Sequence, residues 1–400
     1  MQRLNDSPIG ARIRTRRQLL KLSVRHAADK AGISHATWSR IERGLQGTDN
    51  RFTLAAIATS LRCSVGDLTG QQSVIPAGQI EAGDGAYETM RAVVDADLSY
   101  GPLATDGPPV DALERELDLV LSLRRRCDYA GATSRLPDLV RGLHTAAFGD
   151  ERPTALRLLV RANDAASFVV RFLGHPASAA LVSERAQQAA EALGDPVMLG
   201  LAAYTRAHAA IGCGLYQRAR LLADAAADML EQHAAVPDAM PVRGQLLMTS
   251  AMTLYAIGDL SGAADRVEEA QRLATYTGET DALWLSFGPT NINFWRISME
   301  TDGGDPGEAI EIARTTNPQV IESTSKQTAF YLDVARALAR TGRDPEAVRM
   351  LATAERLAPQ RVRGNPLAVE STRLLLDRVQ RNAAGSQLLG LAERIGVARG

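Results

Sequence analysis

The side chains that most often carry catalysis or bind metals are scattered along this 400-residue chain. Its six His residues fall on different segments, and Cys63, Cys127 and Cys213 are far apart. No CxxC, HExxH, GxSxG or GxxxxGKS/T spacing occurs, so zinc sites, hydrolase elbows and phosphate loops are not indicated. The run from Gly303 to Gly307 favours a turn between helices. We therefore expect no enzyme, no metal and no cofactor.

The residues best suited to bind another molecule are basic, and they concentrate at one end of the chain. Residues 1–70 hold 12 Lys and Arg against 5 Asp and Glu, whereas the remaining residues hold 33 against 41. A small basic segment joined to a larger acidic one is typical of a nucleic-acid-binding module fused to a second module. The alternative is that these Arg residues only solvate a helical bundle.

Helix signals place the basic residues on a bundle of five helices. Residues suited to begin helices recur along the segment: Ser7-Pro8, Ser23, Ser34, Thr53 and the capping box Ser64-x-x-Asp67. The second helix should end at Ala31, before a Gly32 turn that needs a positive φ, and the third, residues 34–43, should end at Gly44. Two short helices separated by a tight Gly turn are typical of a helix-turn-helix.

The same segment resembles the Cro/phage-repressor (Xre) family of regulators. The features that carry the resemblance are Ile9-Gly10, Arg12-Ile13, Leu22-Ser23, Ala28, Gly32-Ile33-Ser34, Glu42-x-Gly44 and the Leu-x-x-Ile-Ala pattern at 54–58. Two positions depart from the family. Val24 stands where a phosphate-bonding Gln is frequent, and Ala27 stands where a core Leu is usual. We expect the bulky Trp38 to fill the space left at Ala27.

The resemblance implies that the third helix enters the major groove of DNA. By family position, the residues facing the bases are Ser34, His35, Ala36, Thr37, Ser39 and Arg40. Arg40 can pair with both acceptors of guanine, and Ala36 can touch a thymine methyl group. For His35, a phosphate or solvent position is the alternative. The expected phosphate contacts, which fix register more than sequence, are Arg14, Arg17, Arg25, Arg43 and Arg51.

After residue 70 the pattern changes to a linker and then to repeats. Gly and Pro cluster at 70–85 and at 101–109, so we expect a linker at 71–110 with one short helix over 87–98 and a domain junction near 71–85. In 111–400, helix pairs recur, with a small residue at a fixed place in each second helix: Ala132, Ala179, Ala219, Ala263, Ala309 and Ala347. Turns precede them at Cys127-Asp128-Tyr129, Gly174, Gly214, Gly258-Asp259, Gly304-Asp305 and Gly342-Arg343.

Small residues at that place let two helices pack closely, and stacked pairs bury a continuous core. The expected fold is all-α, with an N-terminal five-helix lambda-repressor-like helix-turn-helix domain (residues 1–70) and a C-terminal tetratricopeptide-like α-solenoid. The repeat region resembles actinobacterial Xre-type regulators with tetratricopeptide-like C-terminal domains. The resemblance rests on SERAQQAAEALGDP (183–196), FGPTN (287–291), LDVARALARTGRDPEAVRMLATAERLAP (332–359) and Asn365-Pro366-Leu367. It implies a regulator without implying one effector.

Residues 284–296 concentrate two of the three Trp and two of the seven Phe residues. Pro289 should break or kink a helix there, and Asn291 and Asn293 offer amides to a peptide backbone or a small polar ligand. First helices of repeats form a concave binding face. The residues expected on that face are Phe168, Tyr204, His208, Met248, Met252, Tyr255, Asn291, Phe294, Ser298 and Arg336. With Trp284 and Trp295 they make up the expected ligand-binding residues. Alternatively, the aromatic side chains are ordinary repeat core and Asn291 serves a cap or turn.

Neither a signal peptide nor an 18-residue apolar run is present, so a soluble cytoplasmic protein is expected. The sequence favours a sequence-specific DNA-binding transcriptional regulator. We expect a homodimer on a double-stranded operator, modulated by a peptide or small-molecule effector in the repeat domain. The alternative is a DNA-tethered scaffold whose repeats dock a partner protein. A closed, aromatic-lined pocket would favour sensing, and a broad groove with charged walls would favour docking.

Overall fold

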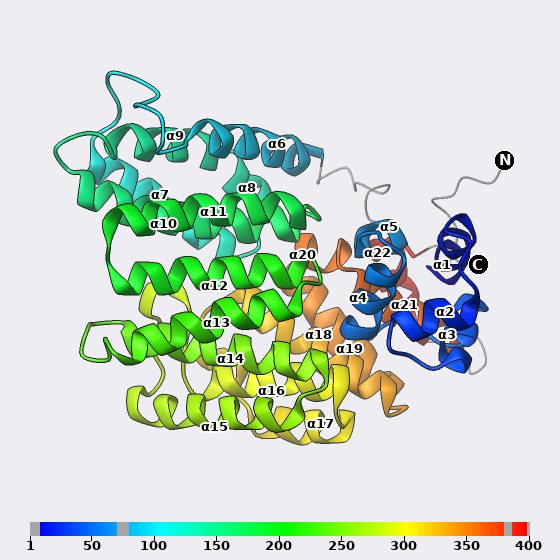
Figure 1. Cartoon of the computed structure of the whole chain (residues 1–400). Helices are drawn as coiled ribbons and strands as arrows, with labels where there is room; N and C mark the ends of the chain where they lie inside the picture. Colours follow the sequence, from blue (N-terminus) through cyan, green and yellow to red (C-terminus); the bar gives the residue numbers. More distant parts are fainter. Residues whose placement is uncertain (1–8, 70–79, 380–385, 398–400) are drawn as a thin grey trace. The chain divides into compact units, whose positions relative to one another are not determined.

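Five short helices form at the N-terminus of the computed structural model, which describes residues 9–69, 80–379 and 386–397 (Figure 1). They are α1 (Ile9–Leu19), α2 (Val24–Lys30), α3 (His35–Glu42), α4 (Arg51–Ser60) and α5 (Val65–Thr69). We call this five-helix segment the head. The expected start at Ser7-Pro8 and the linker residues 70–79 lie outside the described residues.

The helix ends of the head follow from short polar side chains and glycine. The Ser23 and Ser34 hydroxyls accept N–H groups at the starts of α2 and α3, and Gly32 between them has a φ of +65°. Ser64 and Asp67 form the expected reciprocal cap of α5. The fourth helix begins earlier than predicted, at Arg51 rather than Thr53, because the Asn50 side chain accepts the Thr53 N–H and is the cap.

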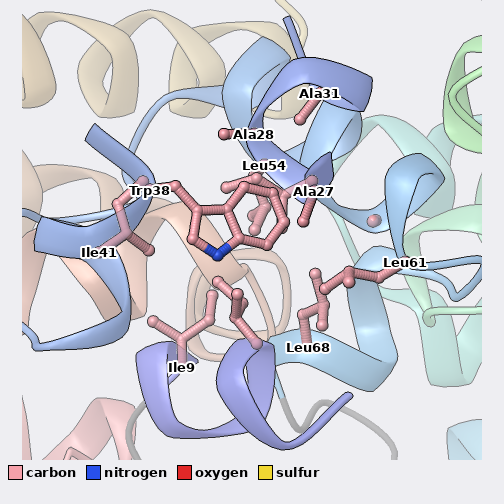
Figure 2. Close-up of a cluster of buried hydrophobic side chains, with 12 residues drawn as sticks. Ile9, Ala27, Ala28, Ala31, Trp38, Ile41, Leu54, Leu61 and Leu68 are labelled. Atoms are coloured by element: carbon pink, nitrogen blue, oxygen red, sulfur yellow. The ribbon is translucent and has the colours of Figure 1, made fainter. Parts of the chain in front are cut away.

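Trp38 lies in the middle of the core of the head (Figure 2). It is fully buried together with Ala27 and Ala28, which confirms that the indole occupies the space left by the small residue at position 27. A side chain at Gly10 would meet the Ile41 carbonyl at 2.2 Å, so glycine permits the close approach of α1 to α3. Burial of this cluster fixes which face of α3 points outward.

The rest of the described chain is also helical. The next helices are α6 (Ile80–Asp95), α7 (Val110–Arg125), α8 (Tyr129–Thr133), α9 (Leu136–Ala146), α10 (Arg152–Phe172), α11 (Pro176–Leu193), α12 (Pro196–Gly212), α13 (Tyr216–Glu231), α14 (Ala239–Ile257) and α15 (Leu260–Thr277). After them come η4 (Ala282–Trp284), α16 (Pro289–Gly303), α17 (Pro306–Thr315), η5 (Pro318–Val320), α18 (Thr324–Arg340), α19 (Asp344–Leu357), α20 (Pro359–Arg363), α21 (Pro366–Val379) and α22 (Ser386–Ile395). A β-bridge joins Thr280 to Phe287.

The repeat pattern read from the sequence is present in the helices. The six small residues of the second helices, Ala132, Ala179, Ala219, Ala263, Ala309 and Ala347, are all at most 1% exposed. At five of the six turns the residue two positions before the start of the second helix adopts a positive φ: Cys127, Gly174, Gly214, Gly258 and Gly342. The next N–H then donates to a carbonyl five residues earlier, which ends the first helix in a Schellman turn. Helices α10 to α15 pack in chain order (Figure 1).

The chain divides into two compact units, and each contains some of these helices. The first unit holds residues 1–76, 296–315 and 328–400, and the second holds residues 77–295 and 316–327. Two local expectations need correction. The short helix expected over 87–98 is α6, which ends at Asp95, and Pro289 begins α16 instead of breaking a helix, because proline suits a first helical position. Residues 304–305 form the expected turn between α16 and α17.

Candidate functional site

One face of α3 is left open by the packing of the other. Trp38 and Ile41 are buried in the core of the head, whereas Ser34, His35, Ala36 and Arg40 are exposed, and Thr37 and Ser39 are half-buried. The Arg40 side chain is held in place, since its guanidinium donates to the Gln46 side chain at 3.0 Å and to the Thr37 hydroxyl at 3.3 Å. The exposed face therefore carries the donors and acceptors that can address base edges.

Three of the five Arg residues expected to contact phosphate are exposed on the head. They are Arg14, Arg25 and Arg43, and Arg43 also donates to the Ser39 carbonyl at 3.2 Å. Exposed guanidinium groups keep their donors available to phosphate oxygens, and they need no conformational change in the core to reach them.

Arg17 serves the core of the head. Its guanidinium makes two bonds to the Glu42 carboxylate, at 2.6 and 2.9 Å, and the Trp38 indole N–H donates to the same carboxylate at 2.7 Å. The side chains of Arg17 and Glu42 are only 11% and 6% exposed. Burial opposes ionisation of Glu42, but the bonds from Arg17 and Trp38 outweigh it and lower its pKa. The Arg17 guanidinium, which was expected to contact phosphate, is thus occupied by a carboxylate of the protein.

Arg51 is also engaged within the protein. Its guanidinium donates to the Ser298 hydroxyl at 2.8 Å and lies 3.3 Å from the Asp333 carboxylate, while its backbone N–H donates to Asp302 at 3.0 Å. All four residues belong to the first compact unit. The guanidinium of Arg51, which was expected to contact phosphate, therefore pairs with carboxylates of the protein.

Arg336, which was expected to face a ligand, binds the same two carboxylates as Arg51. It is 1% exposed, and it binds the carboxylates of Asp302 and Asp333 and the backbone carbonyl of Asp49. Arg340 donates to the Asp49 carboxylate at 3.0 Å. Burial disfavours the charged form of Arg336, but the two carboxylates outweigh it and raise its pKa. We call this set the ion-pair network: Asp49, Arg51, Asp302, Asp333, Arg336 and Arg340.

The network balances three guanidinium groups against three carboxylates. A buried charge without a partner is strongly unfavourable, so each member depends on the others. Asp302, with no exposed side-chain surface, is ionised because Arg336 and Arg51 overcome the effect of burial and lower its pKa. Ser298 and Arg336 thus have a structural explanation that needs no ligand. The network ties α4 of the head to α16 and α18 within the first unit.

Four of the residues expected to bind a ligand do come together in the second unit. The rings of Phe168 and Tyr204 are 5.9 Å apart, Phe168 and His208 are 5.2 Å apart, and His208 and Trp295 are 5.8 Å apart. We call these four residues the aromatic cluster. Tyr204 is buried, whereas Phe168, His208 and Trp295 keep accessible surface. The cluster therefore differs from a closed core.

Positive charges surround the aromatic cluster. The guanidinium groups of Arg124 and Arg171 lie 5.5 and 4.9 Å from the centre of the Phe168 ring. Arg124 is paired with Asp164 at 2.6 Å, and Asp164 also accepts the Thr205 hydroxyl. Burial, together with Arg171 and Lys326, lowers the pKa of His208 well below its usual value. The imidazole is therefore a neutral ring near physiological pH.

The remaining expected ligand residues vary in their surroundings. Met248 is fully buried, and Met252 and Phe294 are 6% and 8% exposed, so these three side chains are mainly core. Tyr255 is half-buried. Asn291 is 3% exposed, and its amide oxygen accepts the Gln245 side chain at 2.8 Å. The Arg125 guanidinium lies over the Trp284 ring, 4.9 Å from the centre of that ring.

Sequence reasoning missed the polar residues beside the aromatic cluster, above all Lys326, Arg124 and Gln245. One signal was available, because Lys326 is one of only three Lys among 45 basic residues. No spacing rule links it to α12 or α14, since the contacts join segments 40 or more residues apart. In the described residues, no group of three or more His, Cys, Asp or Glu is arranged to hold a metal ion. Within the same residues, no helix is long and apolar enough to cross a membrane.

Comparison with known proteins supports the assignment of the head. A family model described as a helix-turn-helix domain matches residues 8–69. The uncharacterized HTH-type transcriptional regulator RghRB of Bacillus subtilis (strain 168) is 32% identical over 103 residues, which are 24% of this chain and 74% of that protein.

Among solved structures, Bacillus thuringiensis PlcR in complex with the peptide PapR7 and DNA matches 70% of this chain and 99% of that chain. The sequence identity is 14% and the TM-score is 0.26, values too low to support an argument about this chain. The match to RghRB, by contrast, spans most of that regulator at substantial identity. The chain belongs to the family of HTH-type transcriptional regulators.

Proposed function

We propose that this transcriptional regulator is a homodimer without enzymatic activity, and that an effector bound by its helical repeats modulates its affinity for an operator. The observation that supports an effector site is the aromatic cluster. Rings from α10, α12 and α16 lie in contact, and Phe168, His208 and Trp295 among them keep accessible surface. Apolar rings with a few polar groups beside them are typical of a site for a peptide or a small molecule.

The open face of α3 supports the DNA-reading part of the proposal. Its exposed residues Ser34, His35, Ala36 and Arg40, with Thr37 and Ser39 at the edge, have the size and polarity needed in the major groove. Arg14, Arg25 and Arg43 supply contacts to phosphate. A single head of this size buries too little surface for tight operator binding, which favours two heads on two half-sites.

An effector can change DNA affinity only if it binds one state of the regulator more tightly than another. The test therefore starts from operator fragments obtained by genome-wide mapping of bound sites. Fluorescence anisotropy then measures the affinity of the full chain for such a fragment. The candidates added are peptides encoded by the regulated genes and metabolites of the enzymes that these genes encode. We expect one of them to change operator affinity at least about fivefold, the lower range of typical allosteric coupling.

Two variants locate the response. Trp295→Ala removes a ring of the aromatic cluster and should abolish the effect of the effector while operator binding without effector stays intact. Tyr276→Ala is the matched control, because Tyr276 is an aromatic residue of α15 that is 79% exposed. An unchanged response in Trp295→Ala would move the effector away from this cluster. A response mediated only by an added partner protein would favour the scaffold alternative.

A further inference from the structure

Lys326 differs from the other cations near the aromatic cluster in what it contacts. Arg124 and Arg125 each have a carboxylate partner, Asp164 at 2.6 Å and Asp281 at 2.7 Å. The ammonium group of Lys326 donates instead to the backbone carbonyls of Leu285 and Ser286, and no carboxylate of the described residues lies within 4.0 Å of it. An ammonium group has three N–H donors, so two carbonyls leave one donor for another acceptor.

The position of Lys326 follows from a chain of contacts. The Gln245 side chain donates to the same Leu285 carbonyl at 2.9 Å, and Gln245 lies on α14 one turn before Thr249. The Thr249 hydroxyl lies 3.5 Å from the His208 ring nitrogen. Residues four apart on a helix are neighbours on one face. Lys326 therefore lies beside the same stretch of α14 that contacts the aromatic cluster, and its side chain is only partly buried.

The charges around Lys326 favour an incoming anion. Burial lowers its pKa to about 7, and Arg124 and Arg125 act in the same direction, while Asp281 and Glu279 oppose them in part. Because Asp281 and Glu279 offset the effect of burial only in part, a further negative charge nearby would stabilise the charged form of Lys326. An anion placed against the ammonium would supply that charge and complete its hydrogen bonds.

We infer that the effector carries an anionic group, such as a carboxylate, that binds the ammonium group of Lys326, and an apolar or aromatic body that lies against Phe168, His208 and Trp295. The inference rests on the proposed effector function and adds the chemical class of the ligand. A cationic effector is disfavoured at this place, because Arg124, Arg171 and Lys326 lie around the rings.

The test uses two fluorescent probes that share an aromatic body and differ in charge. These are 8-anilinonaphthalene-1-sulfonate, an anion, and N-phenyl-1-naphthylamine, which is neutral. Each is titrated into the full-length protein and into the Lys326→Met, Lys30→Met and Trp295→Ala variants, with circular dichroism as a check on folding. Lys30 is the matched control, since it is an exposed lysine of α2.

Lys326→Met should weaken binding of the anionic probe about tenfold, the effect of losing one hydrogen bond from a charged donor, and leave the neutral probe unchanged. Lys30→Met should change neither affinity, and Trp295→Ala should weaken both. Equal affinity of the anionic probe for the wild type and for Lys326→Met would overturn the inference alone. If Trp295→Ala affected neither probe, the proposed effector cluster would fail as well.

A measurement on the unaltered protein covers the case in which Lys326→Met does not fold. The anionic probe should bind less tightly as the pH rises from about 6 to about 9, because an anion favours the protonated amine, while the neutral probe should show no trend. The facing groups are Arg124, Arg125, Asp281, Glu279 and the neutral ring of His208, and carboxylates and guanidinium groups do not ordinarily titrate in this range. A flat profile for the anionic probe would overturn the inference.

Discussion

Removing one carboxylate from the ion-pair network should destabilise the first compact unit strongly. The variant is Asp302→Ala. Asp302 has no exposed side-chain surface and Arg336 has 2%. The network holds three guanidinium groups and three carboxylates, so the variant leaves one positive charge without a partner. The Asp302 carboxylate also accepts two hydrogen bonds, one from the backbone N–H of Arg51 and one from the guanidinium of Arg336.

The burial of the pair sets the size of the effect. Two charges about 4 Å apart interact by about 4 kcal/mol at the effective dielectric of a protein, and breaking a buried pair by removing one partner costs about 3–5 kcal/mol. We therefore expect a loss of about 3–5 kcal/mol in the free energy of unfolding. Glu311→Ala is the control in the same unit, because Glu311 and Arg314 form a pair whose side chains are 61% and 57% exposed. It should cost less than about 1 kcal/mol.

The assay is a urea titration followed by circular dichroism. Hydrogen exchange with mass spectrometry then shows whether protection is lost in α4, α16 and α18 as the network predicts. The double variant Asp302→Leu/Arg336→Met should recover much of the loss, since it removes both charges of the central pair. A loss below about 1 kcal/mol in Asp302→Ala, or a loss equal to that of Glu311→Ala, would refute the argument that these charges are buried together.

Three further predictions concern the head and the assembly. Arg40→Ala should weaken operator binding by about 1–3 kcal/mol and relax specificity at one base pair. Arg14→Ala should instead weaken binding to all sequences and flatten the salt dependence of binding. Fluorescence anisotropy with operator variants distinguishes the two effects. Because the pKa of Glu42 is lowered, its contribution to stability is present above the unfolded value of about 4.3 and is lost as the pH falls below it. Acid unfolding of Glu42→Gln should therefore show a weaker pH dependence. Light scattering on the full chain should give twice the mass of 42.9 kDa, and a monomer would contradict the dimer.

Local signals in the sequence predicted much of the fold. Capping residues such as Ser34 act within three or four positions, so the boundaries of α2 and α3 could be read directly. The buried Ala at a fixed place in each repeat reflects helix packing between neighbours in the sequence, which is why positions such as Ala219 and Ala347 were found. Asn50 was missed because Thr53 is also a suitable cap, and only the backbone position decides between them.

The residues of the aromatic cluster were partly predictable for the same reason. Phe168, Tyr204 and His208 lie on successive first helices, and repeat spacing brings first helices side by side. Lys326 and its carbonyl partners could not be found in this way. The irregular segment between α15 and α16, with positive φ values at Leu283, Trp284 and Ser286, places the carbonyl groups, and no repeat pattern predicts its path.

The basic residues of the head show a more general limit. A guanidinium group binds a phosphate and a carboxylate with the same donors and the same geometry, so charge and position in the sequence cannot separate the two uses. The choice depends on whether a carboxylate lies nearby in the fold. Arg17 pairs with Glu42, which lies 25 residues away in the sequence. Arg51 pairs with Asp302, which lies 251 residues away. A basic patch read from sequence therefore overstates the number of DNA contacts whenever the protein itself supplies the anions.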